Sequence, residues 1–482
     1  MTVIRVDRIH GHPGMDTVEV AEDRVVRIGR ARDFPTVTHD RGGHWLLPGL
    51  VDNHVHPIGL AAQSNRLDVS DVTDVAELIE RLAERAAATT GPIVAVGFDD
   101  EKTQAAVMPT ADELDSATAD RPVVVYRHCT HVASVNHAAL AAAGYDRDTP
   151  EPEGGRIRRN RDGTPTGVLE ETALTPLSQA LSGSLDEPDA TAVLSVMADL
   201  RRRGVVAISA MVAAGSSMWC SGEDELGVIA ALGDTSPVRI DVFVICTSPT
   251  DLRTAARQLD ASGPQVRFAG WKGFADGSLG ARTAALRQPY HDDPSTSGLV
   301  VADNLDDMAV TAVELGGKAA IHAIGDLAVE RALETARRMG VRGSVRIEHA
   351  SVADPDQVQR MADLGVVASV QPSFVSSDAP WIERRLGPAR AAWAYPFASM
   401  RDAGVELRGG SDAPIEPPDP LVGIRDAVAD RPERLDIGAA VDLYAGEPLV
   451  AGGPATFVLV RGEPGSTDAA VAEVWQAGKR TV

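Results

Sequence analysis

Between residues 44 and 412, short runs rich in β-branched residues alternate with longer helical stretches, and no other feature limits the possible folds as strongly. Such alternation is typical of βα units, because parallel strands need long crossover connections that are usually helices. Eight runs have this character, at 44–56, 204–212, 238–247, 266–277, 318–324, 344–350, 365–372 and 404–412. One connecting helix, over 325–340, has Asp326 near its start and Gly340 at its end. Eight units predict an α/β fold with a (β/α)8 TIM barrel.

Both ends of the chain have the period-2 pattern of short antiparallel strands, in residues 3–28 and in the runs ATFVLVRG and AVAEVWQAG. Because chain termini often lie close together, we expect one small sheet domain from 1–47 and 431–482, beside a barrel domain of 48–430. The first two barrel runs are separated by far more than an ordinary connection. This insertion, at about 60–200, has its own strands at 91–98 and 121–128 and a helix over 76–88. It is expected to lie over one face of the barrel, as a lid or pocket wall or as a structural embellishment.

The net charge of -23 disfavours nucleic acid and anionic membrane surfaces as partners. No apolar run approaches the ~20 residues of a membrane-spanning helix, so a soluble, cytoplasmic protein with a small-molecule substrate is expected. A homodimer is expected only because it is the commonest oligomeric state of soluble proteins. The three cysteines, Cys129, Cys220 and Cys246, lack CxxC spacing, which argues against a disulfide framework or a thiolate zinc site. They are expected to be buried, inert thiols.

The candidate chemistry begins with His54 and His56 in LVDNHVHP. Side chains at i and i+2 of a strand point to the same face, so the two imidazoles could bind one metal ion. A histidine pair alone is a weak signal. Further polar residues occur at or near the ends of four other predicted strands, and the carboxyl ends of barrel strands converge on the face that carries catalysis. These residues are Lys272, His322, His349 and Asp412.

Each of these residues also has a structural interpretation. His322 could be a hydrogen-bonded core histidine, His349 could be the ion-pair neighbour of Glu348, and Asp412 could cap a turn before its proline. Lys272 is harder to explain this way, because a buried unpaired ammonium is costly. An ammonium repels cations, so a lysine among metal ligands must lose its positive charge. Burial favours the neutral amine, which could take up carbon dioxide and become an anionic carbamate that bridges two divalent ions.

Several motifs of the chain resemble those of the amidohydrolase superfamily. Within it, they are most similar to the amidohydrolase-3 group, which includes YtcJ-like proteins and N-substituted formamide deformylase. They are LLPGLVDNHVHP, THVASVNHAAL, EGGRIRRNRDGTPTGVLEETAL, WKGFADGSLGARTAAL, IHAIGDLAV, RIEHA, SVQPSF and GSDAPIEPPDPL, which together span nearly the whole chain. The sequence departs from the family where the second barrel strand commonly ends in a His-Asp pair, because Ser209 and Ala210 stand there.

The resemblance implies a barrel with a composite β-sandwich and a metal site formed by one set of residues: His54, His56, Lys272, His322, His349 and Asp412. Asp412, Lys272 and His322 are the candidate catalytic residues. The resemblance also implies that His131, Arg282 and Gln371 face the substrate. Zinc is the first candidate for the metal, as one or two ions, although manganese, iron, cobalt or nickel would suit the same ligands.

The predicted activity is hydrolysis of an amide-type C–N bond, in an N-acyl or N-formyl amine, by metal-activated hydroxide. Metal coordination lowers the pKa of water from 15.7 to about 7, and Asp412 would act as general base and then as general acid. A deaminase or a hydrolase of esters or cyclic amides could use the same hydroxide. A catalytically silent ligand-binding homologue is the alternative from another class.

Overall fold

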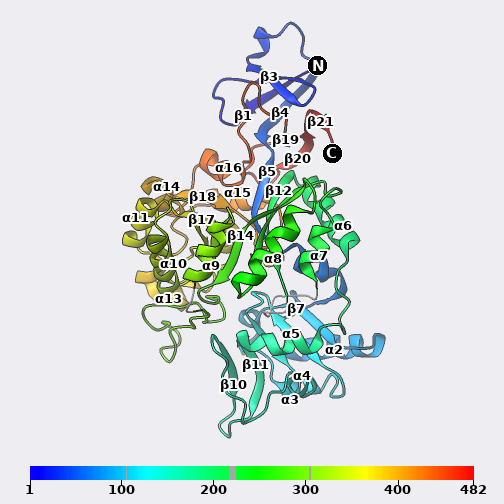
Figure 1. The fold of residues 1–482 in the computed structure, drawn as a ribbon, viewed down its shortest axis with the longest axis vertical. Coiled ribbons are helices and arrows are strands. Elements are labelled where there is room, and N and C mark those ends of the chain that lie inside the picture. Colours follow the sequence, from blue (N-terminus) through cyan, green and yellow to red (C-terminus); the bar gives the residue numbers. More distant parts are fainter. Residues whose placement is uncertain (105, 216–223, 303–304) are drawn as a thin grey trace.

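The computed structural model describes residues 1–104, 106–215, 224–302 and 305–482. Three sheets are stacked along the long axis of the molecule, with the barrel in the middle (Figure 1). The sheet made from both chain ends lies at one end of the barrel, and the insertion lies at the other end.

The central sheet contains eight parallel strands, which agree with the eight predicted runs. Their order around the barrel follows the sequence from β5 to β18, so each strand pairs with the next one along the chain. The strands are β5 (Leu50–Val55), β12 (Val205–Ala213), β13 (Arg239–Ile245), β14 (Val266–Phe274), β15 (Lys318–Ala323), β16 (Val345–His349), β17 (Val367–Val370) and β18 (Glu406–Gly409). The prediction of an eight-stranded α/β barrel is confirmed.

The barrel closes between its first and last strands at the end where the predicted site residues lie. Asp412 N–H donates to the His54 carbonyl at 2.7 Å, and His56 N–H donates to the Ala413 carbonyl at 2.8 Å. Gly410 makes this close approach possible, because a Cβ at this position would lie 2.6 Å from the backbone nitrogen of His54. The chain therefore brings residues 54 and 412 together through the backbone alone.

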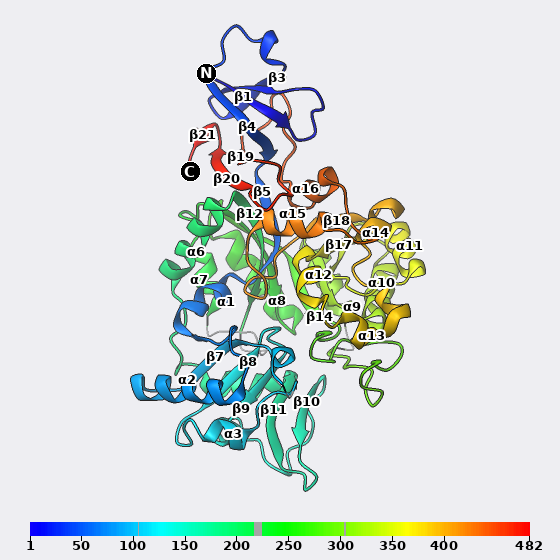
Figure 2. The ribbon, with the colours of Figure 1, turned by 180° about the vertical axis from the view of Figure 1, so that it is seen from behind.

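Helices surround the barrel and cover its apolar outer surface (Figures 1 and 2). They are α1 (Pro57–Ala62), α6 (Ala190–Arg202), α7 (Glu225–Ala230), α8 (Pro249–Asp260), α9 (Asp306–Glu314), α10 (Asp326–Met339), α11 (Pro355–Leu364), α12 (Pro372–Asp378), α13 (Ile382–Ala391), α14 (Phe397–Ala403), α15 (Pro420–Val428) and α16 (Ile437–Tyr444). As predicted, α10 begins at Asp326 and is closed by Gly340, which follows its last residue, Met339, and has a φ of 64°, the left-handed conformation favoured after a helix.

A second sheet joins the two ends of the chain and has seven strands. They are β1 (Thr2–Ile9), β2 (Thr17–Ala21), β3 (Arg24–Gly29), β4 (His39–Pro48), β19 (Phe457–Arg461), β20 (Ala470–Gln476) and β21 (Lys479–Arg480). The prediction of a single strand over 44–56 was wrong, because this run contains the end of β4 and all of β5. Gly49 separates them at a crowded point, where a Cβ would lie 2.6 Å from Val206.

The insertion after β5 forms a third sheet, of six strands, in the order β10-β11-β9-β8-β7-β6. They are β6 (Leu67–Asp68), β7 (Ile93–Phe98), β8 (Val123–Arg127), β9 (Val132–Val135), β10 (Gly155–Arg159) and β11 (Pro165–Glu171). The helices here are α2 (Val75–Ala88), α3 (Ala111–Asp115), α4 (His137–Ala142) and α5 (Thr175–Leu181), and the short 3-10 turns here are η2 (Gln63–Asn65), η3 (Asp100–Lys102) and η4 (Thr172–Leu174). A further 3-10 turn, η1 (Ala31–Asp33), lies between β3 and β4 of the second sheet. The sequence predicted β7, β8 and α2.

Two of the cysteines, Cys129 and Cys246, are buried free thiols, as expected. Cys220 lies outside the described residues. Within the described ranges, none of the helices combines the length and the apolar character needed to cross a membrane.

Candidate metal centre

Five barrel strands deliver the predicted metal-site residues to one end of the barrel. His54 lies in β5 with His56 directly after it, Lys272 lies in β14 and His322 in β15. His349 ends β16, and Asp412 follows β18. All these residues are at or near the carboxyl ends of their strands, where the catalytic residues of barrel enzymes lie.

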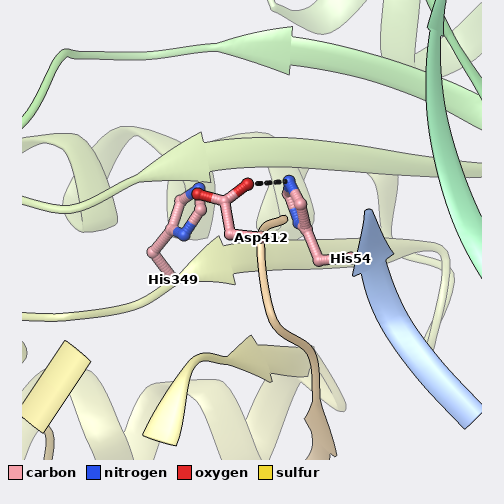
Figure 3. Close-up of side chains that lie close together, drawn as sticks. All are labelled: His54, His349 and Asp412. Carbon is pink, nitrogen blue, oxygen red and sulfur yellow. Dashed lines mark ion pairs between the residues drawn. The ribbon is translucent and has the colours of Figure 1, made fainter. Parts of the chain in front are cut away.

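Three side chains form a compact donor set at this end (Figure 3). His54, His349 and Asp412 each offer one ligand atom, and these atoms lie within 4.8 Å of one another. Asp412 Oδ1 lies 3.2 Å from His54 Nε2. All three residues are buried. Two imidazoles and a carboxylate suit zinc and several other divalent transition metals.

The remaining predicted ligands lie against this donor set. His56 Nε2 is 3.4 Å from Asp412 Oδ1, and Lys272 Nζ is 3.5 Å from His54 Nε2. The ring of His322 lies 4.5 Å from that of His349, measured between centroids. The structure therefore brings all six predicted residues together in one cluster.

The orientation of His54 is fixed by a carboxylate inside the barrel. His54 Nδ1 lies 2.5 Å from Glu348 Oε2, and both side chains are fully buried. Glu348 also forms an ion pair with Arg346, with 2.5 Å between Nε and Oε1. Arg346 in turn donates to the Ser209 hydroxyl at 3.2 Å. Ser209 lies where the family commonly has a His-Asp pair. In this chain Ser209 contacts Arg346 and, through Arg346 and Glu348, helps to hold His54 in place.

The alternative in which Glu348 pairs with its neighbour His349 is wrong. Alternation along β16 places Glu348 toward the barrel interior, where it meets His54. His349 ends the strand with a φ of 72°, which is uncommon for a non-glycine residue and breaks the alternation. His349 Nδ1 contacts Gln371 Oε1 at 2.7 Å, which leaves Nε2 for another partner. Gln371, predicted to face substrate, is 2% exposed and positions His349.

The protonation states of these groups are those that bind a cation. Burial, together with Lys272, lowers the pKa of His54 well below its ordinary value. Burial and His54 do the same for His349. Burial would raise the pKa of Asp412, but the nearby His54 and His56 outweigh it and lower that pKa. Neutral imidazoles beside an ionised carboxylate are the ligand forms that a divalent metal requires, so the donor set fits such an ion.

The other two predicted substrate residues have different surroundings. His131, in the insertion, lies 2.7 Å from Glu171 through Nδ1. Burial would lower its pKa, but the Glu171 carboxylate outweighs burial and raises the pKa of His131 to about 9. The ring of His131 lies 5.1 Å from that of His322, so His131 reaches the cluster. Arg282 pairs with Asp292 at 3.1 Å, and it is not among the residues that line the cavities described next.

Two cavities meet at the cluster, and His131, His322, His349 and Asp412 line both. The large cavity has a volume of about 150 Å³ and lies between the barrel end and the insertion. The small cavity has a volume of about 50 Å³ and extends toward α12 and α13. Sequence reasoning did not find the small cavity, because its walls come from segments far apart in the chain.

Replacing Glu348 by Gln should weaken metal binding by roughly 10- to 100-fold, because the carboxylate that orients a ligating imidazole is lost. Metal affinity can be measured by competition with a chromogenic chelator. Glu473→Gln is a matched control, since Glu473 is also a buried carboxylate that contacts a histidine and an arginine, His39 and Arg41, but in the terminal sheet. Equal effects of the two substitutions would contradict a role of Glu348 in metal binding.

The family was tested by comparison with known proteins. A model described as "Amidohydrolase family" matches residues 38–466. The chain belongs to this family. The putative amidohydrolase YtcJ of Bacillus subtilis is 35% identical, over 80% of this chain and 73% of that protein. N-substituted formamide deformylase of Arthrobacter pascens is 28% identical, over 82% of this chain and 75% of that enzyme.

A solved structure from Pyrococcus horikoshii, described as an uncharacterized metal-dependent hydrolase, has a TM-score of 0.71 and 26% identity, and the likeness covers 100% of both chains. The family membership and this likeness show that the chain is a hydrolase, and it has a candidate His/His/Asp metal site.

Proposed function

We propose that this amidohydrolase cleaves an amide-type C–N bond in an N-acyl or N-formyl amine, with one or two divalent ions, zinc first, in the cluster around Asp412. The observation that carries the proposal is the buried set of His54, His349 and Asp412 at the point where two cavities meet. The sequence identity of 28% to N-substituted formamide deformylase supports the choice of bond.

The metal would be held by His54, His349 and Asp412, with His56, His322 and Lys272 as further ligands. When bound, it supplies Lewis acidity and makes hydroxide available at neutral pH. A carbamate on Lys272 would add negative charge close to His54 and offset part of the charge of two ions. Without that modification, the Lys272 ammonium would repel the metal.

Asp412 is the residue that we propose to move the proton. Its lowered pKa keeps it as a carboxylate at neutral pH, so it can accept a proton from the attacking water. The same carboxyl then delivers this proton to the departing nitrogen, because an amide nitrogen must be protonated before it leaves as an amine. His131 lines both cavities beside His322, and as an imidazolium it can donate a hydrogen bond to the substrate carbonyl oxygen.

The test combines metal analysis with a substrate screen. Protein purified without chelators and with bicarbonate is expected to contain one to two divalent ions per chain, measured by plasma mass spectrometry. The metal-loaded protein should hydrolyse N-formyl or N-acyl amines, with activity lost on chelation and restored by zinc. Turnover of esters, cyclic amides or amino-substituted heterocycles alone would replace the amide proposal, and metal binding without any turnover would favour a silent homologue.

A further inference from the structure

One face of the insertion sheet forms a wall of the large cavity. Val94 in β7 pairs with Val124 in β8, and both residues line the cavity. Tyr126 lies two positions further along β8 and lines it too, as the alternation of side chains along a strand requires. The neighbouring residues Ile93 and Val123 belong to a separate apolar core on the other face, which includes residues of α2. The sheet therefore directs one row of side chains toward the barrel end.

Arg66 continues this row at the edge of the sheet. The edge strand β6 begins at Leu67, which pairs with Ala95 in β7. Arg66 directly precedes Leu67 and has an extended backbone, with φ −99° and ψ 158°, so it lies beside Val94 on the same face. In agreement with this register, Arg66 also lines the large cavity. A row of valines on the cavity wall thus ends in a guanidinium.

The charge of Arg66 is not compensated within the protein. Arg66 is half-buried, and among the described residues its side chain has no hydrogen-bond or ion-pair partner. A partly buried cation without a counter-ion is unfavourable, and a ligand with negative charge removes this cost. A carboxylate suits the site best, because its two oxygens match the forked donors of a guanidinium.

Two carboxylates line the same cavity and are the groups that could favour a cation instead. Glu225 is buried, and it accepts a hydrogen bond from Ala213 N–H at 2.8 Å. Glu187, on the loop after α5, is not free either. Arg66 is therefore the better candidate to bind a charged ligand, and an ammonium group is the competing ligand that the test must include.

Arg66 lies at a distance from the donor set that a substrate would have to span. Neighbouring strands are about 4.8 Å apart, so the row from Arg66 to Val124 is roughly 10 Å wide. His131, which reaches the cluster through His322, directly precedes β9, on the far side of β8. A molecule that contacts both the donor set and Arg66 therefore needs a spacer of several atoms between its scissile bond and its anionic group.

We propose that Arg66 is a specificity-determining residue, which binds a carboxylate at the end of the substrate remote from the scissile bond. An apolar spacer between the two groups lies against Val94 and Val124. The substrate class is then an amide with an ω-carboxylate on a chain of several carbon atoms. This inference rests on the proposed function, because it places the scissile bond at the donor set.

The test uses formamides HCO–NH–(CH2)5–X, in which X is COO⁻, CONH2, CH3 or CH2NH3⁺, and the N-methyl amides CH3–NH–CO–(CH2)5–X, which cover the opposite orientation of the scissile bond. For each compound, kcat/KM and, by calorimetry, the Kd of metal-loaded protein are measured. The carboxylate should be preferred over the carboxamide by about fivefold or more, since a forked pair partly shielded from water is stronger than an exposed one. The short formamide HCO–NH–CH2–COO⁻ cannot reach Arg66 from the donor set, so it should have no such advantage over its own carboxamide.

Two substitutions and a control assign the preference to this guanidinium. In Arg66→Gln the preference for the carboxylate should disappear, because the side chain stays polar but has no charge. Arg66→Lys keeps the charge without the forked donors and should retain part of the preference. Arg161→Gln is the matched control, since Arg161 is exposed between β10 and β11, has no ion pair among the described residues either, and lines neither cavity. It should keep the wild-type preference, and thermal unfolding checks that each variant is folded.

Failure of the two proposals can be told apart. If wild-type protein hydrolyses none of the compounds, the proposed C–N hydrolysis fails for these amides, but the Kd comparison still decides the inference. Tighter binding of the long carboxylates that is lost in Arg66→Gln supports the site. A preference that survives in Arg66→Gln shows that the carboxylate binds elsewhere, the metal included, and overturns the inference. Equal Kd values, a preference for the ammonium compound or no measurable binding overturn it as well.

Discussion

Replacing Asp412 by Asn is expected to reduce kcat by about 10²- to 10⁴-fold, the usual contribution of a general acid–base group. Asparagine keeps an oxygen in the position of Oδ1, but it cannot carry the proton from water to the leaving nitrogen. The metal content should therefore remain largely unchanged, and KM should change less than kcat. Turnover measured on the best amide substrate, with metal per chain determined on the same sample, checks both parts.

The control for this substitution is Asp419→Asn, which changes the same residue type seven positions further along the chain. Asp419 caps α15 through its side chain and pairs with Arg203 at 3.0 Å, away from the cluster. It should retain normal turnover. Full activity in Asp412→Asn would remove this residue from proton transfer. A complete loss of metal would instead show that its role as a ligand dominates.

Much of the barrel could be predicted because each strand leaves a local pattern in the sequence. Buried parallel strands are apolar runs bounded by helical segments, and eight runs in order fix a topology. The chain leaves one sheet and enters the other at Pro48-Gly49, and this pair of breaking residues lies inside a continuous apolar run, so β4 and β5 were predicted as one strand. Strand β9 was missed because it has only four residues, and β10 and β11 were missed because they are rich in polar residues and contain Gly or Pro.

The candidate site, like the fold, could be predicted from the sequence only in part. His54, His56, Lys272, His322, His349 and Asp412 are polar residues at strand ends, and the barrel geometry predicts that such residues converge. The partners that orient them depend on packing across the barrel. Glu348 lies 294 residues from His54 in sequence, and no local pattern distinguishes this pair from an ordinary contact with His349.

Replacing Lys272 by Ala is expected to lower both the metal content and turnover, and the loss should exceed the roughly 10- to 100-fold seen when a ligand's hydrogen-bond partner is removed. Lys272 is 1% exposed and its Nζ is 3.5 Å from His54 Nε2. If this amine is carboxylated, the substitution removes a bridging anion from the cluster. Wild-type protein reconstituted with ¹³C-bicarbonate should show a carbamate carbon resonance that the variant lacks.

Lys318→Ala is the matched control, because Lys318 begins the neighbouring strand β15 at the opposite end of the barrel. It should keep its metal, its turnover and the carbamate resonance. A short carboxylate such as formate or acetate should restore part of the activity of Lys272→Ala, since it supplies two oxygens in the space left by the side chain. If bicarbonate has no effect on metal loading and no resonance appears, Lys272 is not carboxylated. The cluster would then hold a single ion through His54, His349 and Asp412.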